Sequence, residues 1–350
     1  MVEYEDLVVP RGAEFFRVNG FSIATISPDL MTHRLGKQIY NTELAFARRM
    51  VGDDIKRRAA HTIFYGIDAF NKDEKPYSRW HLGIKNGKVV VVAMERIGRE
   101  HHRRRFHCEG EKENVREFLP TLPSLLGEPE EIALVLNASD FTPEEAADIY
   151  RDRYELDPKG IQRYIRAYVD YDIFKDIVIP SVSANVEIRR LNYFKITRSR
   201  HSDQILQSIR DFYRAIQGDN FSFKSRSMRT PGAYYDAQDQ FSKTRLGIGG
   251  IIAQAIANVD NNDTIPLSMG GDLAVAEEAR DMGLGLALRW ITYASVFRNH
   301  DYRDGIITSY FTEDNVASQK IIFDHLKGIE VSRSLWVVLK TKPKLAQGSK

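Results

Sequence analysis

An apolar strand pattern, a turn with two glycines and an apolar helix pattern follow one another between residues 270 and 297. Leu273-Ala274-Val275 is typical of a buried strand that ends at Val275 or Ala276, and Gly283 and Gly285 mark the turn. Glycine lets the main chain approach a ligand without a Cβ in the way. Amides at the first turn of a helix favour an anion. The segment therefore predicts a site for a phosphate group at the start of a helix.

The order of residues in the turn limits which phosphate-containing ligands are candidates. The dinucleotide pattern G-x-G-x-x-G and the P-loop pattern G-x-x-x-x-G-K-[ST] are both absent. The pattern here is R-x-x-G-x-G, from Arg280 to Gly285, and it resembles the pyrophosphate-binding motif of the GNAT superfamily of acyl-coenzyme-A-dependent N-acyltransferases. The elements expected after it also follow the order of that superfamily: a helix at 286–297, a strand at 305–310, a helix at 316–326 and a strand at 334–339.

The resemblance implies direct transfer of an acyl group from a thioester to an amine, in a cleft where two parallel strands part. Three groups of residues are then expected to bind the coenzyme. Main-chain groups of Leu273, Ala274, Val275 and Ala276 would contact the pantetheine arm, and the amides of Asp281, Met282, Gly283, Leu284, Gly285 and Leu286 would hold the diphosphate beside the charge of Arg280. Asn315, and Ser318 in the place of a small alanine, would meet the coenzyme at the second helix.

One position departs from the family pattern. The family helix N-x-x-A-x-x-L-Y carries a tyrosine that protonates the departing thiolate, whereas this chain has Ile322 there. Three explanations remain: another donor such as Tyr310 or Tyr293 replaces it, water suffices because a thiol has a pKa near 8.5, or the domain binds acyl-coenzyme A without turnover. The sequence leaves all three open.

The attacking amine also needs a general base, and carboxylates on the central strands are candidates. Asp272 is the first candidate because it interrupts an apolar strand, where an ionised group needs a partner or a function. Its alternative is an exposed place near Gly270 and Gly271. Glu313 and Asp314 are further candidates, although both have the position of helix-capping residues.

The C-terminal half is predicted to be a GNAT-like mixed sheet flanked by helices. A strand is expected at 186–191, a helix at 204–217, a short helix at 233–241, and paired strands at 246–259 and 265–275. Tyr234 and Tyr235 of that short helix and the basic loop 224–229 are candidates for the acceptor pocket. Pro180 and its small neighbours place the domain junction, so the expected division is 1–180, 181–342 and a polar tail at 343–350.

The N-terminal half is predicted to be a second α/β domain of unknown role. Residues 29–50 have helical spacing, 80–94 have the pattern of a hairpin around Asn86-Gly87, and 131–137 form an apolar strand pattern. The hairpin 82–92 could belong to a degenerate GNAT repeat, because many GNAT proteins are tandem. Nothing in it resembles the pyrophosphate motif, so such a copy would have lost coenzyme binding. Such a copy would serve as scaffold or as a wall of the acceptor site.

Two polar segments of the N-terminal half carry rival interpretations. Residues 134–153 resemble the last catalytic segment of DDE transposases, with Asp68 as first carboxylate, but Asp157 stands where the pattern needs Glu. The run 96–113 mixes histidines and Cys108 with four arginines between Arg99 and Arg105. Its spacing matches no zinc motif. A solvated loop or edge hairpin is the expectation for it, and phosphate or nucleic-acid contact is the functional alternative.

Composition sets the remaining expectations. The 50 Lys and Arg residues balance 48 Asp and Glu residues, so no global charge favours nucleic acid or anionic lipid. Cys108 is the single cysteine, which excludes an intrachain disulfide and fits a reducing compartment. No long apolar run or basic leader is seen, so we expect a soluble cytoplasmic protein.

These observations favour an acyl-coenzyme-A-dependent N-acyltransferase, with acetyl-coenzyme A as the first candidate co-substrate, no metal, and a small-molecule or protein amine as acceptor. A coenzyme-A-binding sensor or scaffold without turnover is the first alternative. A nucleic-acid-processing protein that uses the transposase-like half is the second.

Overall fold

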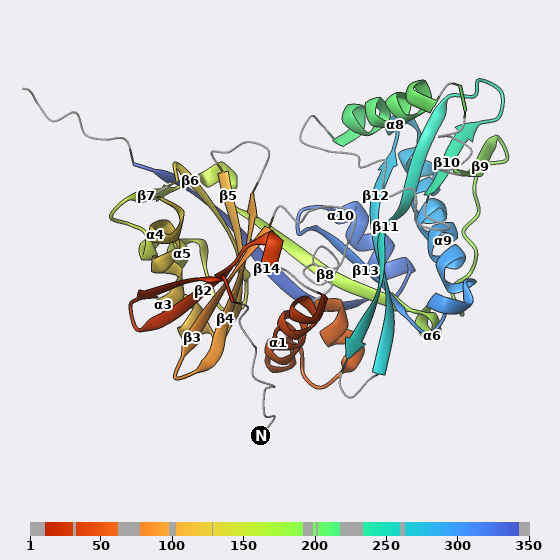
Figure 1. Ribbon diagram of the computed structural model, residues 1–350. Coiled ribbons are helices and arrows are strands. Elements are labelled where there is room, and N and C mark those ends of the chain that lie inside the picture. Colours follow the sequence, from red (N-terminus) through yellow and green to blue (C-terminus); the bar gives the residue numbers. More distant parts are fainter. Residues whose placement is uncertain are drawn as a thin grey trace, which may run out of the picture. The chain divides into compact units, whose positions relative to one another are not determined.

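The computed structural model describes residues 11–30, 33–61, 78–97, 103–127, 129–191, 199–200, 202–217, 234–259 and 263–342. Asp68, Arg99, the basic loop 224–229 and the tail 343–350 lie outside the described residues. The chain forms two compact units (Figure 1). Unit 1 contains residues 1–165 and 332–350, and unit 2 contains residues 166–331.

Unit 1 is a sheet with helices on both faces. Its strands are β1 (Glu14–Val18), β2 (Phe21–Ile26), β3 (Ser78–Lys85), β4 (Lys88–Ile97), β5 (Arg103–Gly110), β6 (Glu131–Asn137), β7 (Tyr154–Leu156) and most of β14 (Ile329–Thr341). Its helices are α1 (His33–Val51), α3 (Lys112–Phe118), α4 (Leu122–Leu126) and α5 (Pro143–Ile149), with short 3₁₀ turns at Pro28–Leu30, Leu119–Thr121 and Pro158–Gly160. The strand order is β1-β2-β3-β4-β5-β6-β14, with β7 beside β14.

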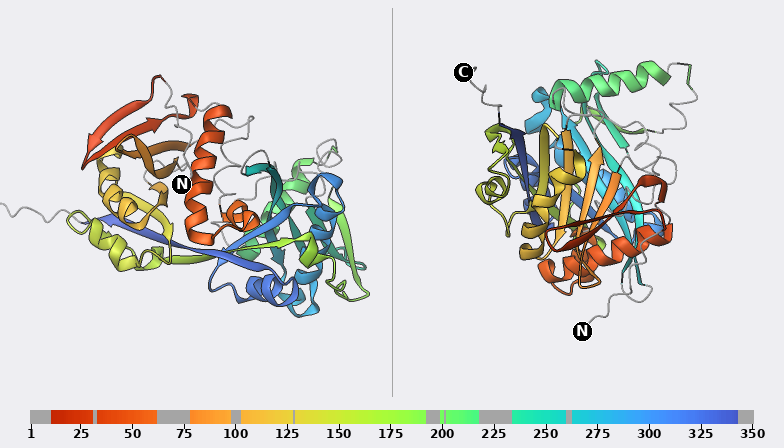
Figure 2. Two further views of the ribbon diagram at one scale, coloured as in Figure 1. Left: turned by 90° about the horizontal axis from the view of Figure 1, so that it is seen from below. Right: turned by 60° about the vertical axis from the view of Figure 1, so that its left-hand side comes forward.

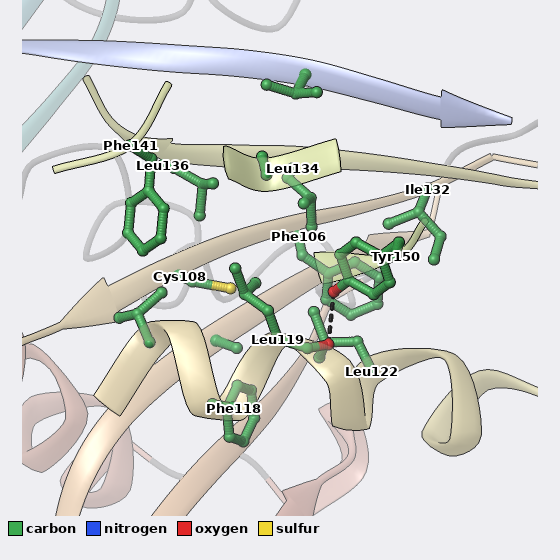
Figure 3. Packing of buried hydrophobic residues seen from close by; sticks show 14 of the residues in the cluster. Phe106, Cys108, Phe118, Leu119, Leu122, Ile132, Leu134, Leu136, Phe141 and Tyr150 are labelled. Atoms are coloured by element: carbon green, nitrogen blue, oxygen red, sulfur yellow. Dashed lines mark hydrogen bonds between the residues drawn. The ribbon is translucent and has the colours of Figure 1, made fainter. Parts of the chain in front are cut away.

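Two apolar clusters cover the two faces of this sheet. Helix α1 lies on one face (Figure 2). Its residues Ile39 and Phe46 pack against Trp80 and neighbouring strand residues. On the other face, α3, α4 and α5 pack on Phe106, Cys108 and Leu134 (Figure 3). There the hydroxyl of Tyr150 donates a hydrogen bond to the carbonyl of Leu119. Burial raises the pKa of the Cys108 thiol, so this cysteine remains protonated inside the core.

The predicted hairpin around Asn86 and Gly87 is confirmed. Asn86 and Gly87 have φ angles of 50° and 75°. This left-handed conformation is the one that a two-residue hairpin turn between β3 and β4 requires. Thr142 begins α5 with a capping box: its hydroxyl accepts from the amide of Glu145, and the Glu145 carboxylate accepts from the amide of Thr142. Residues 134–153, which resembled a transposase segment, therefore contain the end of β6 and a capped helix.

Unit 2 is also built on a sheet. Its strands are β9 (Val186–Leu191), β10 (Tyr234–Asp239), β11 (Arg245–Val259), β12 (Asp263–Val275), β13 (Ile306–Thr312) and part of β8 (Gln162–Asp170). Its helices are α6 (Tyr171–Phe174), α8 (Ser202–Gln217), α9 (Leu284–Phe297) and α10 (Val316–Gln319), with 3₁₀ turns at Glu277–Met282 and His300–Tyr302 and a π-helical turn at Lys320–His325. The order is β8-β13-β12-β11-β10-β9, in which β12 and β13 are parallel.

Helix α9 packs on one face of β10, β11 and β12 (Figure 1). Leu284 and Leu288 contact Tyr235 and Ala237 there. Glycine makes this close packing possible, because a Cβ built at Gly247 would lie 2.8 Å from a methyl of Leu288. Side chains alternate along a strand, and Asp236 accordingly faces away from α9, where it pairs with Arg245 at 2.7 Å. Arg245 in turn donates to Ser208 of α8, which places α8 on the opposite face.

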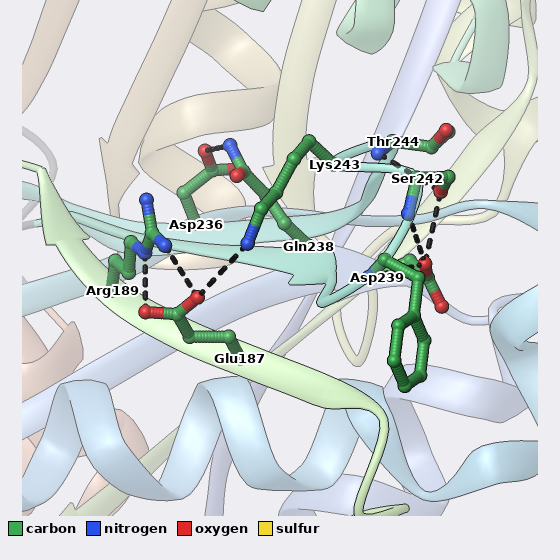
Figure 4. Close-up of polar contacts among 9 residues, drawn as sticks. Glu187, Arg189, Asp236, Gln238, Asp239, Ser242, Lys243 and Thr244 are labelled. Atoms are coloured by element: carbon green, nitrogen blue, oxygen red, sulfur yellow. Dashed lines mark hydrogen bonds and ion pairs between the residues drawn. The ribbon is translucent and has the colours of Figure 1, made fainter.

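Two local expectations are wrong. Residues 233–241 do not form a helix: Tyr234–Asp239 is strand β10, paired on both sides with β9 and β11. The strand then ends in a turn, because the carboxylate of Asp239 accepts from the amides of Phe241 at 3.0 Å and Ser242 at 2.7 Å (Figure 4).

The described residues of the run 96–113, which are 96–97 and 103–113, form neither an exposed loop nor a hairpin at the edge of the sheet. Arg103–Gly110 is the interior strand β5, hydrogen-bonded to β4 on one side and to β6 on the other. Phe106 and Cys108 point into the core on one face. Arg105, one residue along, lies with its guanidinium 4.1 Å from the ring of Trp336.

The division into units also differs from the expected domain boundaries. The compact units part at residue 165 rather than 180, and residues 334–340 of β14 pair with β6 of unit 1, with Leu335 opposite Leu136. The two units share one order of elements. In each, a strand and a helix precede three antiparallel strands, and a helix then leads to a strand parallel to the third, so unit 1 repeats the plan of unit 2.

Candidate functional site

Strands β12 and β13 pair along only part of their length. Their parallel register runs from Leu267 opposite Ile306 to Gly270 opposite Ser309. Beyond that point β12 continues to Val275 and β13 to Thr312 without pairing to each other. The main-chain groups on the facing edges of residues 271–275 and 310–312 thus lack the ladder hydrogen bonds that parallel neighbours normally form. This parting is the geometry expected of a coenzyme cleft.

A β-bulge lies in β12 where the strands part. Gly271 is opposite Gly250 and Ala274 is opposite Ile248, so β12 has one more residue than β11 over this stretch. The extra residue falls at 272–273. As a result Gly270 and Leu273, three residues apart, both face α9. Bulges interrupt the ladder and redirect side chains, and they are common beside active sites.

The predicted pyrophosphate turn is exposed, and no side-chain cap closes the start of the helix that follows it. Arg280, Asp281, Met282 and Gly283 are all exposed at the surface. Gly283 is the N-cap of α9 with φ 69° and no side-chain cap. No side chain of the cap residue therefore takes up the amides of the first turn. A Cβ at Gly285 would lie 3.6 Å from Val275 and 3.3 Å from Ile321, so the helix begins against the end of β12.

Some of the main-chain and side-chain groups predicted to bind the coenzyme already have partners. The Leu273 carbonyl accepts from the exposed Gln217 side chain at 3.0 Å, and the Ala276 amide donates to the Leu246 carbonyl at 2.8 Å. The side-chain oxygen of Asn315 accepts from the amide of Ser318 at 3.0 Å and so caps α10. The side-chain nitrogen Nδ2 of Asn315 is the group that could donate to a ligand.

A buried polar cluster lies where the strands part. The hydroxyl groups of Tyr293 and Ser309 are 2.7 Å apart, and a Cβ built at Gly270 would lie 2.9 Å from the Tyr293 oxygen. Burial raises the pKa of Tyr293, so the phenol stays protonated at neutral pH. Arg289, one helical turn before Tyr293, donates from Nη1 to the carbonyl of Gly271 at 3.2 Å.

The candidate catalytic residues fall on both sides of the parting point. Asp272 lies at the bulge, but its side chain is outside the described part of the structure. Tyr310 is the first residue of β13 beyond the pairing, and its ring lies 5.5 Å from the guanidinium of Arg166. Glu313 follows β13, and its carbonyl accepts a hydrogen bond from the side chain of Gln319. The fold thus brings Asp272 and Tyr310 to the edges of β12 and β13 that part, with Glu313 at the end of β13.

Ile322, which stands where the family pattern has a tyrosine, is closely packed. Its side chain is 2% exposed, and a Cβ at Gly328 would lie 2.7 Å from its Cγ2. It belongs to the π-helical turn Lys320–His325, in which each residue is displaced relative to an ordinary α-helix. The position therefore faces packed chain, and an aliphatic side chain suits it.

The two tyrosines proposed for the acceptor pocket lie in a strand instead of the expected helix. Tyr234 and Tyr235 lie within strand β10 and are buried. Tyr235 packs with Leu284 and Leu288 under α9, so its ring belongs to the core of unit 2. Among the described residues, no cluster of three His, Cys, Asp or Glu side chains has metal-ligand geometry.

Sequence reasoning missed Arg289 and Ser309. Ser309 stands in an apolar strand, and Arg289 interrupts the apolar helix 284–297, the same kind of signal that drew attention to Asp272. The charge of Arg289 within an apolar helix was the sequence signal that could have identified it. The partner of each residue became visible only with the fold.

Most of the chain is similar in structure to solved GNAT proteins. A GCN5-related N-acetyltransferase from Sphaerobacter thermophilus matches with a TM-score of 0.60 and 11% identity, over 94% of this chain and 98% of that one. A tandem GNAT protein from the clavulanic acid biosynthesis pathway matches with a TM-score of 0.53 and 12% identity, over 93% and 99%. No family model and no curated protein matches the sequence. The likeness shows a GNAT fold across most of the chain.

No helix in the described ranges is both long enough and apolar enough to cross a membrane.

Proposed function

We propose that this GNAT-fold chain transfers an acyl group from acyl-coenzyme A to a primary amine, with unit 2 as the catalytic unit. The observation that carries the proposal is the parting of β12 and β13 after Gly270 and Ser309, next to the uncapped start of α9. One coenzyme molecule fits both features. Its diphosphate would lie at the amides of Leu284, Gly285 and Leu286 beside the charge of Arg280, and its pantetheine arm would lie along residues 271–275.

The chemistry is a direct displacement. The amine nitrogen attacks the thioester carbonyl, the new C–N bond forms, the C–S bond breaks, and the amine loses a proton while the thiolate gains one. The protein contributes by holding the two reactants together, which lowers the entropic part of the barrier. We assign proton removal to Asp272, at the bulge, with Glu313 as the alternative base.

We assign proton delivery to Tyr293 or Tyr310 in place of the missing family tyrosine. Tyr293 is favoured because its hydroxyl lies where β12 and β13 part. Ser309 can relay or orient that proton through the 2.7 Å contact. Acetyl is the simplest acyl group for this site, and the acceptor is a small-molecule or protein amine.

Unit 1 is proposed as a copy without coenzyme binding. At the corresponding turn after β5, Glu111 is the N-cap of α3, and Glu113 lies in its first turn. Arg49 pairs with Glu111. These carboxylates would repel a diphosphate where unit 2 offers Arg280 and uncapped amides.

Binding is tested by calorimetry with coenzyme A and acetyl-coenzyme A on the full chain. Arg280→Ala removes the exposed cation of the turn and is expected to weaken binding about 5- to 30-fold, the effect of roughly 1–2 kcal/mol for one phosphate contact. Arg298→Ala is the matched control, because Arg298 is also exposed but lies at the other end of α9. No binding by the unmodified protein would overturn the proposal.

Turnover is tested separately by release of free thiol from acetyl-coenzyme A with a panel of primary amines. Asp272→Asn is expected to abolish thiol release while leaving coenzyme affinity unchanged. Tyr293→Phe and Tyr310→Phe then distinguish the two proton donors. Binding without thiol release for any amine would instead support the non-catalytic coenzyme-A sensor.

A further inference from the structure

A buried cation with no described counter-ion lies at the acyl end of the proposed coenzyme site. The side chain of Arg289 is 8% exposed, and its Nε has no hydrogen-bond partner among the described residues. Its contacts are the Gly271 carbonyl, 3.2 Å from Nη1, and the ring of Tyr293, whose centroid is 5.9 Å from the guanidinium carbon. No described carboxylate forms an ion pair with it. Arginine is always charged, and burying a charge without a partner carries a large penalty.

The position of Arg289 decides which part of a ligand it could meet. Its guanidinium reaches β12 at Gly270 and Gly271, where pairing with β13 ends. From Gly271 to Val275, next to the proposed diphosphate turn, the strand spans about 13 Å at about 3.3 Å per residue. The diphosphate and Arg289 are thus at opposite ends of the proposed pantetheine path. The group that comes near Arg289 is the acyl group.

Resting on the proposed function, we propose that Arg289 binds a carboxylate at the far end of the acyl group. The preferred donor is then the coenzyme A thioester of a dicarboxylic acid, such as succinyl- or glutaryl-coenzyme A, rather than acetyl-coenzyme A. A carboxylate supplies a counter-ion that none of the described residues provides, and it can accept from Nε and a terminal guanidinium nitrogen together.

A transient negative charge explains the site less well. The oxyanion of the transition state exists only during reaction, whereas a permanent carboxylate stabilises the buried cation throughout the bound state. The two roles give different results: a carboxylate site changes donor affinity, and an oxyanion site changes the rate for every donor alike.

The test compares two donors of the same chain length by calorimetry on the full protein, so no acceptor is needed. Succinyl-coenzyme A carries a carboxylate where butyryl-coenzyme A carries a methyl group. The unmodified protein is expected to bind the succinyl thioester at least about tenfold more tightly, which corresponds to about 1.4 kcal/mol. In Arg289→Met, which keeps side-chain length without the charge, this preference is expected to disappear while butyryl affinity changes less than about twofold.

Coenzyme A itself reports whether the variant still has an intact site. Equal affinity of the unmodified protein for the two thioesters would overturn this inference and leave the proposed function standing. Loss of turnover in Arg289→Met by the same factor for all donors, with unchanged affinities, would also overturn it and assign Arg289 to the oxyanion. Failure to bind any thioester would overturn the proposed function as well.

Discussion

The contact between Gly270 and Tyr293 gives a prediction that can be measured without a ligand. A Cβ at residue 270 would lie 2.9 Å from the Tyr293 hydroxyl oxygen and 3.2 Å from its Cε1. Carbon does not approach so closely, so in Gly270→Ala the ring and α9 must shift. Overpacking of this kind costs about 1–3 kcal/mol of unfolding free energy. Tyr293→Phe removes the hydroxyl and its bond to Ser309, at a cost of about 0.5–1.5 kcal/mol.

The double variant should be more stable than the sum of the two effects predicts, because the new methyl group enters the space that the hydroxyl leaves. We expect a coupling of about 1 kcal/mol or more, since residues in contact couple by about 0.5–3 kcal/mol. Urea unfolding followed by circular dichroism measures all four proteins. Gly249→Ala is the control for the alanine, because its Cβ would meet Leu273 and Leu288 instead of Tyr293. Additivity to within about 0.5 kcal/mol for Gly270 and Tyr293 would refute the described packing.

Three further predictions concern capping, the missing tyrosine and buried charge. Thr142→Ala removes the capping box of α5. It should lower the free energy of unfolding by about 0.5–2 kcal/mol, measured from the urea midpoint. Residue 322 is 2% exposed, so Ile322→Tyr should overpack the core. The cost should be about 1–3 kcal/mol without any rise in thiol release, and a faster enzyme would contradict this. Burial raises the pKa of Glu95, but the hydrogen bond and charge of His81 and the charge of Arg104 outweigh burial, so the net pKa lies below 4.5. This carboxylate therefore stabilises the fold above its ordinary pKa, and its contribution is lost as pH falls through the lowered pKa. In Glu95→Gln, the free energy of unfolding should fall less steeply as pH is lowered, measured by urea unfolding at a series of pH values. A pH dependence equal to that of the unmodified protein would contradict this role of Glu95.

Much of unit 2 could be predicted from the sequence because its signals are local. The strand at 273–275, the glycine turn and the apolar helix follow from neighbouring residues, and they locate the proposed coenzyme site. Strand β10 could not be predicted in this way. Tyr234, Ala237 and Phe241 have helical spacing, yet hydrogen bonds from β9 and β11 on both sides override that preference.

The N-terminal errors have the same physical origin. Strand β5 carries three successive arginines, and its apolar positions Phe106 and Cys108 are too few to mark a central strand. Its place in the sheet depends on β6, which follows it only after α3 and α4. Strand β14 pairs with β6 of unit 1, so residues about 200 positions apart, such as Leu335 and Leu136, lie opposite each other. No local sequence pattern encodes this pairing.

The side chains at the parting point were the hardest to predict. Their roles depend on a bulge at 272–273 and on the face of α9 that meets it, and both are tertiary features. Asp272 and Arg289 carry the same sequence signal, a charge within an apolar element. Only the described contacts of Arg289 with Gly271 and Tyr293 connect that signal to the site.

Hydrogen exchange with and without coenzyme A tests the central claim most directly, because the claim concerns main-chain amides. We predict slower exchange on coenzyme binding at residues 280–286 and 271–275, with no change at the corresponding turn 110–116 of unit 1. Protection at 110–116 alone, or nowhere in unit 2, would contradict the placement of the coenzyme between β12, β13 and the start of α9.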